Sequence, residues 1–271
     1  MTKPIARLVC DAGTMIGESP LWSRGRLFWT DPLAPRLLIY SDEGLQPLPT
    51  ERPVWSLAGL PGQDVFGTLD GAFCTIDAAG AIRPGLSAAI DAGCRFNDMT
   101  LDPSGGLWAG VMHRGLLATR GAIFHAPSLD QEPRAVATGL GVPNGMKFST
   151  DGSRLYVIDT LMRTLLAYPT YGAQLGEPVI ISDFLDVPGK PDGMTPGADG
   201  TFWVAMWGGS CVVQLAPDGA ILQRITVPAP HVSSVCFVPP DRLFVTTSRM
   251  RLSPQALAEH PGSGALFEIS P

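Results

Sequence analysis

One short pattern recurs six times along the 271 residues of this chain. In each copy, a turn signal rich in Gly, Pro or Asp precedes a short apolar segment that carries an aromatic residue. The aromatic markers are Phe28, Phe66, Trp108, Tyr156, Trp203 and Phe244. They are spaced 38, 42, 48, 47 and 41 residues apart. Strand-rich repeats with a period of about 40–50 residues are typical of β-propeller blades.

The ends of the chain fit the same repeat. The last copy ends after Ile269 without an outer strand, whereas residues 5–10 form an apolar segment that belongs to no copy. If this N-terminal strand pairs into the last blade, the ring closes and no long sheet edge is left open. We therefore predict an all-β fold in which residues 1–271 form a single six-bladed β-propeller domain. A β-sandwich would not explain six evenly spaced units.

The composition supports this fold and excludes several functions. Gly (31) and Pro (26) make up about a fifth of the chain, which disfavours long helices. The net charge of −6 argues against a nucleic-acid partner, because binding phosphates needs a basic surface. No apolar run approaches the roughly 20 residues of a membrane span, and the N-terminus lacks a signal peptide, so we expect a cytoplasmic protein. Five scattered cysteines without a Cys-x-x-Cys pair argue against a disulfide framework.

Polar residues occur at one phase of the repeat, 10 to 12 residues before each marker. They are Glu18, Ser56, Asn97, Asn144, Asp192 and Ser233. The first strand of each propeller blade lines the central channel, so these side chains are expected to converge. Carboxylate and amide oxygens without His or Cys favour one hard divalent cation, Ca²⁺ above all, with Mg²⁺ or Mn²⁺ possible and Zn²⁺ or Fe less natural. An ion that only stabilises the channel is the competing interpretation.

The segments around these residues resemble the gluconolactonase, senescence-marker-protein and regucalcin-like family of six-bladed propellers. The resemblance runs from about Gly17 to Phe267 and rests on five segments, which are 17–22, 95–99 with 107–110, 143–157, 191–205 and 231–249. It implies a divalent metal held by Glu18, Asn144 and Asp192, with Arg95 and Asn97 contacting substrate and Asp192 acting as acid/base group. Members of the family typically hydrolyse sugar lactones to aldonic acids, and some relatives act on organophosphate esters.

Two departures from the family pattern bear on the substrate. Met99 stands where the family often has glycine after the Asn-Asp pair, and residues 113–120 contain no counterpart of a carboxylate that binds sugar in some members. The loops 112–121 and 249–264 are long and are expected on the face that carries the site. His113 is the possible substrate contact that we name from them. The residues leave open which lactone is used, its ring size, and whether the protein is a monomer or a homodimer.

The chemistry of a lactone agrees with these residue types. A lactone is an ester, and its hydrolysis requires a polarised carbonyl, a delivered water and a stabilised oxyanion. A hard cation serves as Lewis acid, Arg95 can donate to ring oxygens or hydroxyls, and Asp192 is the predicted proton shuttle. A metal-bound carboxylate is a weaker base, so Asp98 is the alternative, although strand alternation predicts that it points away from the channel. An esterase or organophosphate hydrolase on the same site and a non-catalytic calcium-binding propeller remain as alternative functions.

Overall fold

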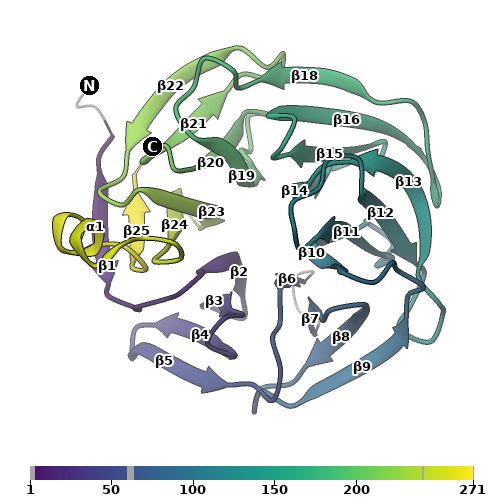
Figure 1. The fold of residues 1–271 in the computed structure, drawn as a ribbon, viewed down its shortest axis with the longest axis horizontal. Helices are drawn as coiled ribbons and strands as arrows, with labels where there is room; N and C mark the ends of the chain where they lie inside the picture. Colours follow the sequence, from purple (N-terminus) through teal and green to yellow (C-terminus); the bar gives the residue numbers. More distant parts are fainter. Residues whose placement is uncertain (1–3, 60–63, 240, 271) are drawn as a thin grey trace.

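The computed structural model describes residues 4–59, 64–239 and 241–270. Almost all regular structure in this part of the chain is β-strand, with one short helix, α1 (Pro254–Glu259). Figure 1 shows the strands as small antiparallel meanders that radiate from a common centre, with the first strand of each meander innermost. The predicted all-β propeller arrangement is therefore confirmed.

Consecutive strands form the first four sheets. The first contains β2 (Glu18–Ser23), β3 (Arg26–Asp31), β4 (Arg36–Ser41) and β5 (Gly44–Pro49). The second contains β6 (Ser56–Ala58), β7 (Val65–Thr68), β8 (Ala72–Ile76) and β9 (Ile82–Ser87). The third contains β10 (Cys94–Leu101), β11 (Leu107–His113), β12 (Gly121–Ala126) and β13 (Arg134–Leu140). The fourth contains β14 (Pro143–Phe148), β15 (Arg154–Asp159), β16 (Thr164–Tyr171), β17 (Gln174–Leu175) and β18 (Val179–Asp183).

The remaining strands join into one eight-stranded sheet. It contains β19 (Lys190–Pro196), β20 (Phe202–Trp207), β21 (Cys211–Leu215), β22 (Ile221–Thr226), β23 (His231–Val238), β24 (Arg242–Ser248), β25 (Leu266–Ile269) and β1 (Ala6–Cys10). Its two halves are linked through the single pair of Trp207 with His231. The described residues thus form five hydrogen-bonded sheets, and the number of six blades stays a prediction. β1 pairs with β25, with Ala6 opposite Ile269.

Buried apolar side chains fill the space between neighbouring sheets. Phe96 of β10 lies with its ring centroid 5.1 Å from that of Phe73 on β8. Trp29, Trp108 and Trp203 are at most 2% exposed, so these tryptophans pack in the core. Burying one Leu, Ile or Phe side chain contributes about 1.5–3 kcal/mol, and the sum over these layers holds the meanders side by side.

The turns between strands are set by aspartate side chains. Asp102 accepts hydrogen bonds from the backbone N–H groups of Ser104 (2.8 Å) and Gly106 (3.0 Å). Gly105 adopts a φ of 91°, a conformation that favours glycine. The same carboxylate accepts a bond from the indole N–H of Trp108 at 2.9 Å. One turn residue therefore both closes the hairpin and orients an aromatic ring of the core.

The segment 249–264, expected to be a long loop, contains α1. Ser253 caps this helix by accepting a hydrogen bond from the N–H of Ala256 at 3.1 Å, and Pro254 occupies its first turn. No helix in the described ranges is long and apolar enough to cross a membrane.

Candidate functional site

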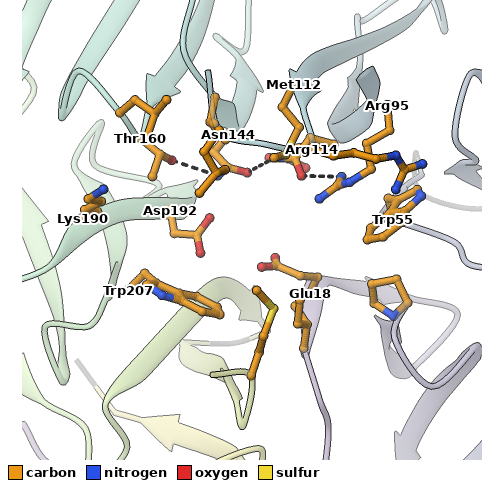
Figure 2. A pocket seen from close by; sticks show the side chains of 18 of the residues that line it. Glu18, Trp55, Arg95, Met112, Arg114, Asn144, Thr160, Lys190, Asp192 and Trp207 are labelled. Atoms are coloured by element: carbon orange, nitrogen blue, oxygen red, sulfur yellow. Dashed lines mark hydrogen bonds between the residues drawn. The ribbon is translucent and has the colours of Figure 1, made fainter. Parts of the chain in front are cut away.

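A cavity of about 600 Å³ lies where the inner strands meet. Four of the six residues at the repeated polar phase line it, namely Glu18, Asn97, Asn144 and Asp192. They come from β2, β10, β14 and β19, so residues distant in sequence converge as predicted. Figure 2 shows the carboxylates of Glu18 and Asp192 facing each other across the cavity, with Asn144 beside them.

The inner strands change register at these positions. The pairing shifts between Glu18 and Leu21, between Phe96 and Met99, between Asn144 and Lys147, and between Pro191 and Met194. A β-bulge interrupts strict alternation and redirects side chains, and bulges are frequent beside active sites. Each ligand candidate thus lies at a local irregularity of its strand.

The bulge in β10 corrects one of our expectations. Asp98 was expected to point away from the channel, yet both Asn97 and Asp98 line the cavity. The register shift between Phe96 and Met99 removes the alternation on which that expectation depended. The carboxylate of Asp98 accepts hydrogen bonds from the N–H groups of Met99 (2.8 Å) and Met146 (3.0 Å).

The three carboxylates of the cavity influence one another. Burial raises the pKa of Glu18 well above its ordinary value, and the charges of Asp192 and Asp98 raise it further, while Arg95 lowers it. Burial likewise raises the pKa of Asp192, which is 6% exposed, and Asp98 adds to this effect. Like charges held together away from water disfavour ionisation unless a cation lies between them. This group of three carboxylates therefore favours a bound positive charge.

A chain of hydrogen bonds crosses three inner strands behind the carboxylates. Arg95 Nη1 donates to Asn97 Oδ1 (2.8 Å), and Asn97 Nδ2 donates to Asn144 Oδ1 (2.7 Å). Asn144 Nδ2 donates to Thr160 Oγ1 (2.9 Å), and that hydroxyl donates to the carbonyl of Pro191 (2.8 Å). Figure 2 shows part of this chain as dashed lines. The amide of Asn144 is thereby fixed from both sides.

Thr160 was not among the residues predicted for the site. It follows directly after β15, the second strand of its sheet, and second strands end on the face where first strands begin. That topological argument was available from the repeat, because the first strand of the same meander carries Asn144. The polar residues at the ends of second strands were the signal that could have found it.

The comparisons with known proteins agree with this geometry. The chain matches the model of the SMP-30/Gluconolactonase/LRE-like region over residues 16–249. The chain belongs to this family. It is 35% identical to a pentonolactonase of Haloferax volcanii over 252 residues, which cover 89% of this chain and 84% of that protein. It is 32% identical to a 6-deoxy-6-sulfogluconolactonase of Pseudomonas putida over 268 residues, which cover 94% of this chain and 90% of that protein.

A solved structure extends the comparison to the fold. The structure of a calcium-binding protein, regucalcin, from Agrobacterium tumefaciens matches with a TM-score of 0.88 at 26% identity, covering 98% of this chain and 93% of that chain. The family predicted from the five sequence segments is therefore confirmed.

One side of the cavity is formed by two arginines, Arg95 and Arg114, that lie against the ring of Trp55. The Arg95 guanidinium carbon lies 3.7 Å from the centroid of the Trp55 ring, and that of Arg114 lies 5.6 Å from it. Arg114 forms an ion pair with Asp70 at 2.7 Å, and Trp55 donates to the same carboxylate at 2.8 Å. Burial and the charge of Arg114 lower the pKa of Arg95 to about 10, although Glu18 and Asp70 raise it. Arg95 therefore remains cationic at neutral pH.

His113 does not reach the cavity. Its neighbours Met112 and Arg114 line the cavity, whereas His113 is not among the residues that do so. Its Nδ1 instead accepts a hydrogen bond from the N–H of Gly115 at 3.0 Å. Because side chains alternate along β11, a strand that turns Met112 inward turns His113 to the other side. The position of His113 therefore speaks against the predicted substrate contact, and Arg114 is the residue of this loop that reaches the site.

A cation in the cavity would need an amide oxygen as ligand in addition to the carboxylate oxygens. In the part of the chain that the structure describes, no three His, Cys, Asp or Glu side chains are grouped as a metal site. Glu18 and Asp192 supply carboxylate oxygens, and Asn144 Oδ1 has a second lone pair besides the one that accepts from Asn97. Oxygen ligands of mixed charge are the donors that Ca²⁺ and Mg²⁺ prefer.

Proposed function

We propose that this protein is a metal-dependent hydrolase that opens sugar lactones to aldonic acids in the central channel of a six-bladed propeller formed by residues 1–271. Its family and relatives make the chain a lactonase-like hydrolase. The relatives' names point to sugar lactones as the small-molecule substrate. The cation, its ligands and the roles of individual residues are our proposal. We expect no nucleic-acid or membrane partner, a cytoplasmic location, and a monomer or homodimer.

The facing carboxylates of Glu18 and Asp192 carry the proposal. Their pKa values are raised by burial and by repulsion among the carboxylates, and a divalent cation between them would replace repulsion by attraction. We assign Glu18, Asn144 and Asp192 as its ligands. Ca²⁺ is the proposed ion, with Mg²⁺, Mn²⁺, Zn²⁺ or Fe as alternatives. When bound at such a site, a divalent ion polarises an ester carbonyl and lowers the pKa of water.

The other residues bind and orient the substrate. Arg95 lines the cavity, held by its bond to Asn97 and by stacking on Trp55, and we assign its remaining N–H groups as donors for ring oxygens or hydroxyls. Asn97 holds Asn144 through its amide nitrogen. Trp55 and Met112 form apolar walls that limit the water around the ester. These residues together account for positioning without themselves transferring a proton.

Asp192 is the proposed proton acceptor and donor. No described residue donates a hydrogen bond to its carboxylate, so both oxygens are free for cation and substrate. The oxygens of Asp98, in contrast, already accept backbone N–H groups of Met99 and Met146. Asp98 thus supports β10 and β14, and Asp192 is the group available for proton transfer.

One experiment tests both the reaction and the cation. The protein is stripped with chelator, single metals are restored, and acid release from pentono- and hexonolactones is followed. We expect release to stop without metal and to return with one divalent ion, but not in Glu18→Gln. Turnover that is unchanged in the stripped protein would overturn the metal requirement. If no metal-loaded form hydrolyses any of the lactones faster than the spontaneous rate, the proposed lactonase activity is wrong.

The apolar part of the cavity favours a second candidate, an esterase or organophosphate hydrolase on the same site. Leu33 and Leu116 line the cavity although they are 46% and 39% exposed, which suits a substrate with an apolar group. A panel of aldonolactones, aryl esters and organophosphates separates the two, because a sugar lactonase should show its highest kcat/KM on the aldonolactones. A non-catalytic calcium-binding propeller, suggested by the regucalcin neighbour, predicts calcium binding without turnover of any member of the panel.

A further inference from the structure

Apart from Arg95, which lies beside Glu18 and is held by Asn97, the charged residues of the cavity are separated by sign. The three lining carboxylates are Glu18, Asp98 and Asp192, all on inner strands and all buried or half-buried. The cations at the outer edge of the cavity, Arg114, Lys190 and Arg251, are exposed. They lie at the beginning of β19 or in the segments that follow β11 and β24. The cavity thus has an acidic floor and a basic rim.

The rim cations differ in whether the protein itself neutralises them. Arg114 forms an ion pair with Asp70 at 2.7 Å. Arg163, another lining residue, donates to the backbone carbonyls of Leu185 and Val187. Lys190 and Arg251 have neither an ion pair nor a side-chain hydrogen bond among the described residues. Two cations at the mouth of the site are therefore available to a ligand.

Lys190 and Arg251 lie on the same side of the cavity, around Trp207. Lys190 is the strand partner of Trp207, and Trp207 is in turn the partner of His231 and stacks on it with ring centroids 4.4 Å apart. Arg251 lines the cavity together with Trp207 and Lys190, and the pKa of His231 is lowered by burial and then by the charge of Arg251. Figure 2 shows Lys190 and Trp207 on the side opposite Arg95 and Trp55. An indole face flanked by two unpaired cations suits a carbon chain that ends in an anion.

We infer that the preferred substrate carries a second, anionic group, a carboxylate, phosphate or sulfonate on the chain away from the lactone, bound by Lys190 and Arg251 beside Trp207. The inference rests on the proposed function, since it assumes that the lactone occupies the acidic floor. The floor carboxylates repel an anion while the rim attracts it, so the two charge zones also fix the direction in which the substrate enters. An attraction of this kind acts on KM more than on kcat, because the anion is far from the reacting carbonyl.

Matched substrates test the inference. We would compare D-glucono-1,5-lactone with its 6-phosphate and with the analogue whose C6 is a carboxylate, measuring kcat and KM for each. The anionic lactones should have a KM lower by about tenfold, the effect of roughly 1.4 kcal/mol. Their advantage should shrink as ionic strength rises, because exposed charges are screened by salt. In Lys190→Gln, the ratio of kcat/KM for anionic over neutral lactone should fall about tenfold, and further in the double variant with Arg251→Gln.

Arg134→Gln is the matched control, because Arg134 is an exposed arginine on the outer strand β13. It should leave the ratio at its wild-type value. Equal KM values for neutral and anionic lactones, or a ratio that Lys190→Gln does not change, would overturn the inference and leave the lactonase intact. If none of the three lactones is hydrolysed above the spontaneous rate, the proposed function fails instead, and the inference fails with it.

Discussion

The same phase of the repeat is used in two ways around the ring. Glu18, Asn97, Asn144 and Asp192 line the cavity, whereas Ser56 and Ser233 are fully buried. The Ser56 hydroxyl shares a hydrogen bond with Thr68 at 2.6 Å, and that of Ser233 shares one with Thr246 at 3.1 Å.

Ser233 links neighbouring units directly and Ser56 does so through Thr68, and neither serine lines the cavity. Ser233 donates to the carbonyl of Gly17, which precedes the inner strand β2, and Thr68 donates to that of Asn97 on β10. A short side chain at this phase satisfies its hydroxyl within the wall, while a longer one extends past the wall into the cavity. The repeat therefore fixes where the side chain starts. The length and polar atoms of that side chain decide whether it bonds within the wall or faces the cavity.

The largest effect is expected at Asp192. Asp192→Asn removes the proposed proton acceptor and should lower kcat on a sugar lactone by roughly a thousandfold, within the range known for general acid–base groups. Asp98→Asn should lower it far less, because that carboxylate is occupied by backbone donors. Steady-state kinetics of both variants, with circular dichroism to verify folding, measure this difference. Equal losses in the two variants would remove Asp192 from its role.

Metal binding should depend on Glu18 and should not depend on Ser233. Adding Ca²⁺ to stripped protein should raise the melting temperature, since a ligand at 100 times its Kd stabilises the folded state by about 2.7 kcal/mol. The increase should disappear in Glu18→Gln and persist in Ser233→Ala. Thermal unfolding monitored with and without Ca²⁺ measures it. An increase of the same size in Glu18→Gln would contradict the assignment of this ligand.

Thr160 should act as a positioning residue. Thr160→Val removes the hydroxyl that accepts from Asn144 and donates to Pro191, and it should weaken metal affinity by about 10–100-fold, as is usual for outer-shell partners. Thr160→Ser keeps the hydroxyl and should restore most of the affinity. Calorimetric titration of Ca²⁺ measures both variants. A purely structural role would predict a lower melting temperature in Thr160→Val without loss of affinity.

The stripped protein should lose stability as pH rises. The folded-state pKa values of Glu18 and Asp192 lie above their ordinary values of 4.5 and 3.8. In this window the folded state binds more protons than the unfolded state, so the free energy of unfolding falls with increasing pH. Denaturant unfolding between pH 4 and 8 should show this slope in stripped protein and a smaller one with Ca²⁺. A slope that is independent of metal would argue against a cation between these carboxylates.

The smallest effect is expected at Ser56. Ser56→Ala leaves Thr68 without its buried partner and should lower the free energy of unfolding by about 1 kcal/mol. The expected change in kcat/KM is less than twofold, because Ser56 does not line the cavity. Denaturant unfolding and lactone kinetics provide the two measurements. A large loss of activity without a loss of stability would place this serine with the functional residues.

Much of the fold and part of the site followed from the repeat. The spacing of the aromatic markers predicted the propeller, and the polar phase identified four residues that do meet in one cavity. The orientation of Asp98 was wrong because alternation holds only in regular strands, and a bulge cannot be located from residue types alone. His113 is the last residue of β11 and does not line the cavity, because alternation along that strand turns Met112 inward, and the position of the strand end could not be derived from residue types alone. The role of Thr160 could be recognised only from the hydrogen-bond chain, because that chain links residues from different meanders.

The pairing of β1 with β25 also has a consequence for how the chain folds. Ala6 finds its partner in Ile269, at almost the opposite end of the sequence. A contact of such long range forms late and slowly, because the intervening chain must first be ordered. During synthesis β1 is made long before β25, and its edge stays unpaired until β25 is available. Until the two strands pair, the open edge of β1 is a site where aggregation can begin.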